Sequence, residues 1–235
     1  MNRNNLYSVA RRQPWAMLLL VCLCCGWTSC INSRKIDKTV ADELGSIPAL
    51  KTALKPANVT VQTSIQQPDT AYLSSTTKTR NKVLPLILYI GFHEQYTTKL
   101  HPQIGLNQLS NSIYQYAKSK PVAERLAGRQ LLIEVDTMPL AFSFNMKGAL
   151  YLLMFTIQRV YREPVYSHLI IRYTLSGGGQ PTQTGQLSFD DPNRQMTDGF
   201  FQTLQMSMRE YLDNYGQQMK KLGPVVMNKI LSETQ

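Results

Sequence analysis

The sequence predicts an α+β fold, a mostly antiparallel sheet with two amphipathic helices packed on one face as a two-layer sandwich. Short apolar runs separated by turn residues predict strands. These runs follow one another along the chain and do not alternate strictly with helices. Two other stretches carry apolar residues at helical spacing on one side only. We expect this globular domain to occupy residues 83–235.

Residues 30–82 precede the domain and are predicted to form a polar tether. They are rich in Thr, Ser, Gln and Pro, a composition that buries little apolar surface. Within this segment, residues 37–54 have apolar side chains at helical spacing, which predicts a short helix. Residues 58–65 have some β character. Residues 66–80 have almost no apolar side chain, which predicts a loop.

The first strong core segment is residues 83–92, VLPLILYIGF, which is apolar on both faces. A short run of this kind predicts a buried strand. Pro85 has no N–H to give to a strand ladder, so we expect it near the strand start or on a sheet edge. His101-Pro102 then introduces an amphipathic helix, and Pro121 is predicted to end it.

More strands are predicted after this helix. Residues 130–136 and 140–144 have apolar side chains at every second position, as half-buried strands do. Lys147-Gly148 is a turn signal. Residues 149–162 begin with nine almost wholly apolar residues and then alternate. We expect one long strand here, because nine residues are too few for a helix that crosses a bilayer.

The C-terminal part predicts a hairpin followed by a long helix. Residues 165–175 alternate, residues 177–181 (GGGQP) turn the chain, and residues 182–189 return as the partner strand. Residues 201–222 carry apolar side chains at intervals of three and four, which is typical of a helix with one continuous apolar stripe. Gly223-Pro224 is a conventional stop, so we expect the helix to end there.

The N-terminal stretch has the pattern of an export signal. An apolar run from Trp15 to Trp27 follows Arg11-Arg12, and the first thirty residues contain no acid. The run is about 13 residues long, whereas a helix that spans a bilayer needs roughly 20. Residues 1–29 are therefore predicted to be a cleaved signal peptide. An uncleaved signal anchor and a twin-arginine export signal are the alternatives.

The end of this stretch, Trp27-Thr28-Ser29-Cys30, resembles the lipobox of bacterial lipoproteins, with Trp27 in place of the usual aliphatic residue. The resemblance implies lipidation of Cys30, with an acyl group such as palmitate, and a mature protein that begins there. Ile31 is not the aspartate that favours inner-membrane retention in that family. The resemblance therefore implies the outer membrane, facing the periplasm. The layout is also loosely similar to that of small accessory lipoproteins of the Gram-negative envelope.

All four cysteines lie at or before position 30, so a chain that begins at Cys30 keeps one thiol, and that thiol carries the lipid. This excludes an internal disulfide and a cysteine-based metal site from the expected domain. The formal charge of +10 falls to +7 without Arg3, Arg11 and Arg12, and the other basic residues are scattered. We therefore expect an ordinary solvated surface or attraction to an anionic membrane, and no nucleic acid partner.

Candidates for chemistry are few, and structural roles are the more common explanation for each. His93, His101 and His168 match no metal-ligand spacing, which favours surface or structural roles. Glu134 and Asp136 share one strand face about 7 Å apart. They form either a pair able to do acid–base work or an ordinary solvated face.

Three oxygen ligands, Asp190, Asp191 and Asn193, lie in one stretch as in calcium loops, but a turn explains them better. The glycines at 177–179 lack the lysine of a phosphate loop. Tyrosines around the long strands form either a ligand platform or aromatic pairs that stabilise a sheet. They are Tyr151, Tyr161, Tyr166 and Tyr173.

The sequence contains no recognisable active site, and we expect no catalytic residue, no metal and no cofactor. It favours a non-enzymatic lipoprotein of the cell envelope, held to the membrane by its lipid anchor. Such a protein acts as an accessory or binding subunit of a transport or outer-membrane assembly complex, with an envelope protein as its partner. The alternatives are a periplasmic hydrolase or ligand-binding protein with an unrecognised site, and a signal-anchored protein without a lipid.

Overall fold

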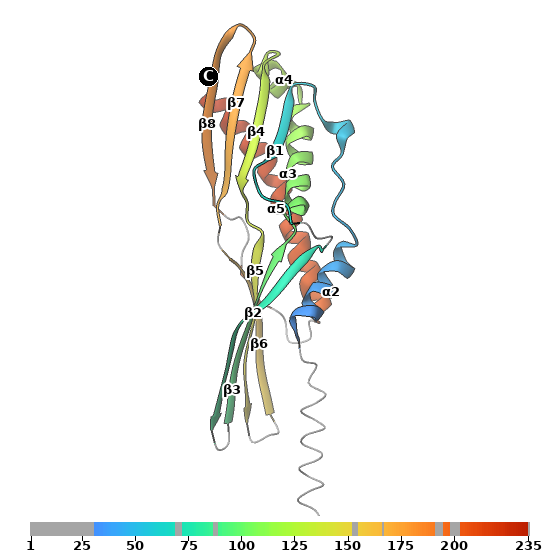
Figure 1. Ribbon diagram of the computed structural model, residues 1–235, viewed down its shortest axis with the longest axis vertical. Coiled ribbons are helices and arrows are strands. Elements are labelled where there is room, and N and C mark those ends of the chain that lie inside the picture. Colours follow the sequence, from blue (N-terminus) through green and yellow to red (C-terminus); the bar gives the residue numbers. More distant parts are fainter. Residues whose placement is uncertain are drawn as a thin grey trace, which may run out of the picture.

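The computed structural model describes residues 31–68, 72–86, 89–151, 155–165, 167–190, 195–197 and 203–234. Over these residues the chain is elongated, with two sheets arranged end to end and helices along one side (Figure 1). The prediction of an α+β fold with mostly antiparallel strands and helices packed on them is confirmed. The strands, however, are divided between two sheets.

The first sheet, in the upper half of Figure 1, has the strand order β1-β4-β7-β8. β1 pairs with β4 in parallel, and the other neighbours are antiparallel. Its inner face packs against the helices through fully buried side chains such as Val59, Ile133 and Ile171. The strands are β1 (Val59–Thr63), β4 (Gln130–Thr137), β7 (Leu169–Gly177) and β8 (Gln180–Phe189).

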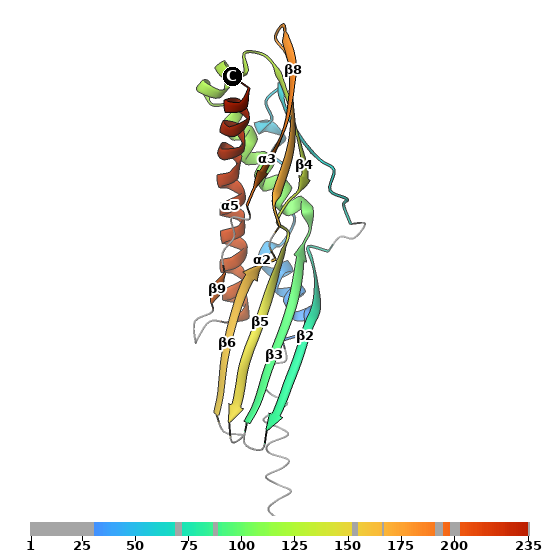
Figure 2. The ribbon, with the colours of Figure 1, turned by 90° about the vertical axis from the view of Figure 1, so that its left-hand side faces the viewer.

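The second sheet is wholly antiparallel, with the order β2-β3-β5-β6-β9. Its upper part lies against α2 and α5, whereas the lower ends of four strands project beyond both helices (Figure 2). The strands are β2 (Ser74–Leu86), β3 (Tyr89–Leu100), β5 (Ala141–Tyr151), β6 (Phe155–Pro164) and β9 (Met196–Thr197).

The longest helix, α5, joins the two sheets into one body. Near its start, the ring of Tyr211 lies 4.3 Å from that of Phe142 in β5, measured between centroids. Near its end, Glu233 accepts a hydrogen bond of 3.0 Å from the hydroxyl of Tyr173 in β7. The helices are α2 (Ser33–Leu44), α3 (Pro102–Ala117), α4 (Lys120–Leu126) and α5 (Leu204–Glu233), with a 3₁₀ turn, η2 (Thr52–Leu54).

The short helix predicted within residues 37–54 is α2, which begins earlier and ends earlier than expected. Its start is fixed by Asn32, whose side chain accepts a hydrogen bond of 2.8 Å from the backbone N–H of Lys35. It ends at Gly45, which has a φ of +64°, a conformation that glycine adopts at little cost.

Residues before position 83 are part of the fold. Asp37 of α2 accepts hydrogen bonds of 2.7 and 2.6 Å from the hydroxyls of Ser74 and Thr76, which attaches the helix to β2. The loop predicted over residues 66–80 is therefore wrong from Ser74 onward, where β2 begins. Val83, the expected start of the globular domain, lies inside this strand.

Residues 83–92 form the end of a hairpin, not the single strand predicted. β2 and β3 pair as far as Leu86 and Tyr89, so the chain reverses within the apolar run. A segment that is apolar on both faces has no alternation to mark its reversal, and the connecting residues, Ile87 and Leu88, are not turn formers. Pro85 does lie on an edge strand, as expected.

The same correction applies to residues 149–162. The single long strand predicted there is the end of a second hairpin, in which β5 and β6 pair as far as Tyr151 and Phe155. The turn predicted at Lys147-Gly148 is wrong because both residues lie inside β5. Their backbone pairs with β3 on one side and β6 on the other, which fixes them in extended conformation.

The helix stop predicted at Gly223-Pro224 is also wrong, since α5 continues through both residues to Glu233. Proline cannot donate to the carbonyl oxygen four residues earlier, which here belongs to Lys220. The hydroxyl of Ser112 in α3 donates to that oxygen instead. Gly223 lies against the same residue, because an added Cβ would clash with Ser112 Oγ. Packing against α3 thus overrides the local stop signal.

The helix predicted to end at Pro121 ends at Ala117 instead. Pro121 belongs to the first turn of the separate helix α4, a position where its missing N–H costs nothing. The predicted hairpin over residues 165–189 is confirmed as β7 and β8, although β7 begins at Leu169, later than the predicted Val165.

Candidate functional site

Glu134 and Asp136 lie on the open face of the first sheet and share one cation. Arg172 Nε lies 2.7 Å from Asp136 Oδ2, and Arg172 Nη2 lies 3.2 Å from Glu134 Oε2. The hydroxyl of Ser64 donates to Asp136 at 2.9 Å. The hydrogen bond from Arg172 holds the pKa of Asp136 below its usual value. A general acid needs the opposite shift, so this cluster suits a structural role.

The three histidines lie in separate places, His93 in β3, His101 just before α3 and His168 just before β7. The ring of His101 caps α3, where its Nδ1 accepts a hydrogen bond of 3.2 Å from the backbone N–H of Gln103. His168 Nδ1 lies 3.3 Å from Asp190 Oδ1 at an exposed position. Within the described residues, no group of three or more His, Cys, Asp or Glu side chains is placed to hold a metal ion.

The predicted calcium-like stretch is only partly described, because Asp191 and Asn193 lie outside the described residues. The glycines at 177–179 have φ values of 92°, 66° and 73°. Residues other than glycine adopt such values at a cost, which explains three glycines at the β7–β8 turn. The prediction that this motif is a hairpin turn is confirmed.

Tyr161 and Tyr173, two of the tyrosines considered either as a ligand platform or as pairs that stabilise a sheet, belong to different sheets. Tyr173 is 5% exposed and belongs to the first sheet. Tyr161 belongs to the second sheet, where the ammonium of Lys147 lies 5.2 Å from its ring centroid. The side chain of Tyr151 and the whole of Tyr166 lie outside the described residues.

A groove of about 690 Å³ lies between residues 48–54, α3 and α5. It is lined by amide, hydroxyl, lysine and apolar side chains, and neither a histidine nor a carboxylate is among its described lining residues. The described lining therefore contains no histidine–carboxylate pair of the kind that activates a serine in a Ser-His-Asp triad.

The lower end of the second sheet has a composition that the fold does not explain. Residues 83–92 and 148–158, which we call the hairpin ends, contain no charged residue. Backbone pairing aligns them in four successive rows, a length of about 10 Å at ~3.3 Å per residue. The row at the tip consists of Leu86, Tyr89, Tyr151 and Phe155.

The hairpin end of β2 exposes apolar side chains on both faces. Val83 and Leu84 are 55% and 67% exposed, and neighbouring residues of a strand point to opposite faces. Higher on the same sheet, Phe142 and Phe144 of β5 are buried beneath the helices. The helices thus cover the upper half of the sheet and leave the apolar lower end open (Figure 2).

A row of basic side chains borders the hairpin ends. With Arg80, this row lines a shallow groove of about 620 Å³, which we call the basic groove. The pKa of the His93 side chain is lowered by burial and by the positive charges of Lys147 and Arg80. The residues of the row are Lys82, His93, Lys147 and Arg159.

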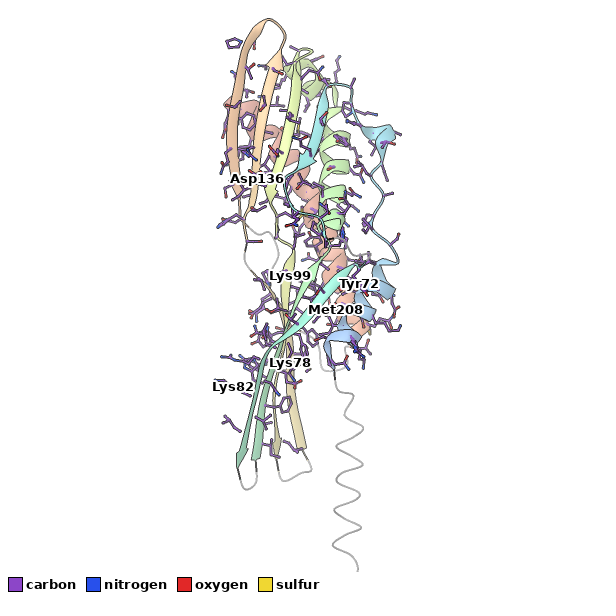
Figure 3. All side chains as sticks on the ribbon, viewed as in Figure 1. Tyr72, Lys78, Lys82, Lys99, Asp136 and Met208 are labelled. Atoms are coloured by element: carbon purple, nitrogen blue, oxygen red, sulfur yellow. The ribbon has the colours of Figure 1, made fainter. Side chains whose placement is uncertain are left out.

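The basic groove lies on the face of the second sheet that the helices leave open. Lys147 and Phe142 are an odd number of residues apart on β5, so they point to opposite faces, and Phe142 contacts Tyr211 of α5. Figure 3 shows Lys82 farther down β2 than Lys78, and far from Asp136 in the upper half of the molecule.

Cys30 lies outside the described residues, but the residue after it is held in place. The carbonyl oxygen of Ile31 accepts a hydrogen bond of 2.7 Å from the hydroxyl of Tyr96. On β3, Tyr96 lies three residues, or about 10 Å, farther from the tip than His93, which is the β3 residue of the basic row. The described chain therefore begins in the same half of the molecule as the hairpin ends.

Sequence reasoning did not find the basic groove or the hairpin ends as a site. Its basic residues are separated by up to 79 positions, from Arg80 to Arg159, and only the strand register brings them together. One signal was present in the sequence, since both apolar runs lack any charge and each is flanked by lysine, arginine or histidine.

Comparison of the chain with protein-family models, with curated proteins and with solved structures finds no match. Among the described residues, no helix combines the length and the apolar character needed to cross a membrane.

Proposed function

We propose that this protein is a non-enzymatic lipoprotein of the cell envelope that touches the membrane at two places. One is the lipid expected on Cys30, which would hold it to the outer membrane on the periplasmic side. The other is the pair of hairpin ends. The observation that supports the second contact is the charge-free lower end of the second sheet, open on both faces.

Water is a poor environment for these side chains. Full burial of a Leu or Val side chain stabilises it by roughly 1.5–3 kcal/mol, so the exposed parts of Val83 and Leu84 contribute about 1–2 kcal/mol each on entering lipid. Exposed apolar patches of this kind mark contact sites on soluble domains. A lipid surface fits here because the patch is at one end and both of its faces are open.

The hairpin ends enter the membrane only to its interfacial region. A strand that crosses the hydrocarbon core needs roughly 9–11 residues. At the hairpin ends, each strand has only four uncharged residues that pair with a neighbouring strand. The outer edge of β2 and the lower part of β6 also have no neighbouring strand among the described residues. Unpaired backbone groups are excluded from hydrocarbon but tolerated where water reaches them.

A two-point contact leaves the upper half of the molecule directed away from the membrane. The first sheet, α3 and the C-terminal half of α5 would then meet a partner in the periplasm, as an accessory subunit of a transport or outer-membrane assembly complex would. The partner surfaces we propose are the open strand edges and the exposed side of α5, which includes Val225 at 49% exposure.

Hydrogen exchange on the full-length chain in phosphatidylcholine nanodiscs tests the membrane contact. Peptides from residues 83–92 and 148–158 should exchange faster in Leu84→Glu/Leu150→Glu than in the unsubstituted chain, because a carboxylate keeps the ends in water. Residues 176–183, at the opposite end of the molecule, serve as the internal reference and should not change. Equal exchange of the hairpin ends in both chains would contradict the proposal.

The lipid anchor is tested separately. Mass spectrometry of the membrane-extracted chain should find its N-terminus at Cys30 with acyl chains attached. An unmodified Cys30 on a chain that still carries residues 1–29 would contradict the lipid anchor. The hairpin contact would still be tested independently by hydrogen exchange.

Affinity capture from solubilised membranes tests the accessory role and should return a defined partner. Repeated recovery of the chain alone would contradict that role.

A further inference from the structure

Several cations elsewhere on the described surface pair with carboxylates, whereas the four that line the basic groove do not. Arg209 Nε lies 2.7 Å from Glu43 Oε2, and Arg172 is shared by two carboxylates. The lining of the basic groove, by contrast, contains four lysine or arginine side chains and no acid. None of the four forms a salt bridge with a carboxylate in the part of the chain that the structure describes.

We propose that the basic groove binds the phosphate of an anionic phospholipid headgroup, an inference that rests on the proposed membrane contact of the hairpin ends. A concentration of positive charge with no carboxylate among its described neighbours repels itself, and an anion from outside would relieve that repulsion. Lysine and arginine are the usual phosphate-binding side chains, as a point charge and as a planar fork.

The position of the groove matches the layering of a membrane. In a bilayer the phosphates lie directly above the acyl chains, and here the basic row lies directly above the four charge-free rows. When the hairpin ends enter the acyl boundary, the row of Lys82, Lys147 and Arg159 is therefore brought to the depth of the phosphates. A basic cluster placed elsewhere on the sheet would not reach that layer.

The floor of the groove leaves room for a headgroup. Its lining includes Gly91, Gly148 and Ala149, which are the smallest residues at the step between the basic row and the apolar rows. His93 lies among them, with its Nδ1 3.3 Å from Arg80 Nη1. A phosphate can thus approach the strands closely and meet side chains from all four of them.

Native mass spectrometry tests this inference on the full-length chain released from nanodiscs that contain equal amounts of phosphatidylglycerol and phosphatidylcholine. The unsubstituted chain should retain phosphatidylglycerol in preference. The variant Lys82→Gln/Lys147→Gln/Arg159→Gln should lose that preference, with a fall in affinity on the order of 100-fold, because each cation near an anionic surface contributes about fivefold. The preference should also weaken as salt is raised.

A matched control removes the same charge elsewhere. Lys55→Gln/Lys120→Gln/Lys221→Gln changes three exposed lysines that do not line the groove and should keep the preference. Equal loss in both triple variants would show that net charge acts without a site, and would overturn the inference. No preference in the unsubstituted chain would overturn it as well.

Two further arms separate the possible causes of a negative result. Inorganic phosphate is added to the released chain, and displacement of phosphatidylglycerol by low millimolar phosphate would assign the groove to a free anion and contradict the lipid. Hydrogen exchange of residues 83–92 in pure phosphatidylcholine nanodiscs reports the hairpin contact alone. Protection there without any phosphatidylglycerol preference refutes the lipid site and leaves the proposed function standing.

Discussion

On the open face of the first sheet, Arg172 lies between Glu134 and Asp136, and apolar side chains of the same strands such as Ile133 and Ile171 are buried on the other face. At the lower end of the second sheet, Lys82, Lys147 and their neighbours meet no described carboxylate, and apolar side chains face outward on both sides. Both regions are antiparallel sheet, so backbone structure does not account for the difference.

The two regions differ in whether their charged and apolar groups are matched by other groups of the chain. Every charge in the cluster on the first sheet is satisfied within the chain, as is usual for a solvated sheet face. The end of the second sheet has exposed apolar surface and four basic side chains that pair with no carboxylate among the described residues. An anionic membrane has a layer of phosphates above its acyl chains. The sheet has a basic row above its apolar rows, so the two surfaces match in the same order.

The largest expected effect comes from removing a core side chain of the second sheet. Phe142 is fully buried against α5, so Phe142→Ala should lower the free energy of unfolding by about 3–5 kcal/mol. Leu84→Ala, on the same sheet at 67% exposure, should change it by less than about 0.5 kcal/mol. Urea unfolding of the detergent-solubilised chain measures both. A large loss in Leu84→Ala would mean that the hairpin end is part of the core.

The next largest effect concerns the contact with Ser112 of α3, which lets α5 continue through Pro224. Gly223→Ala places a Cβ against Ser112 and the backbone of Ile113, which should destabilise the fold by about 1–3 kcal/mol through overpacking. Val225→Ala, at a half-exposed position of the same helix, is the control and should be close to neutral. Equal midpoints in urea for the two variants would show that α3 and α5 are less closely packed than described.

These elements also show which parts of the structure could be predicted from the sequence alone. The hairpin at 177–179 was predictable, because three adjacent glycines have a strong local meaning. The continuation of α5 was not, since a contact with Ser112, more than a hundred residues earlier, overrides a local stop. The hairpin ends were hidden because their apolar runs have no alternation, and the basic groove exists only through a register that joins distant residues.

The smallest expected effect lies in the ion cluster of the first sheet. Because Arg172 lowers the pKa of Asp136 in the folded state from its ordinary value of 3.8, this pair stabilises the fold above that pH. The contribution is lost as pH falls through the folded pKa. Between pH 6 and pH 2.5, the unsubstituted chain should lose up to about 1 kcal/mol more stability than Asp136→Asn.

The double substitution Asp136→Asn/Arg172→Gln checks the cause of that pH dependence. If the ion pair is responsible, Arg172→Gln alone should remove most of the extra acid sensitivity, and adding Asp136→Asn should change little more. Full acid sensitivity in Arg172→Gln would assign the effect to another carboxylate.

The most direct test of the membrane contact is quenching of an introduced tryptophan by lipids brominated on their acyl chains. Leu84→Trp places the probe on a hairpin end, and Leu132→Trp places it on the open face of the first sheet, at 36% exposure. The signal of Trp15 and Trp27, where they are present, is subtracted with the unsubstituted chain. Strong quenching at position 84 with little at position 132 is the predicted result. Equal quenching at the two positions, or none at position 84, would contradict it.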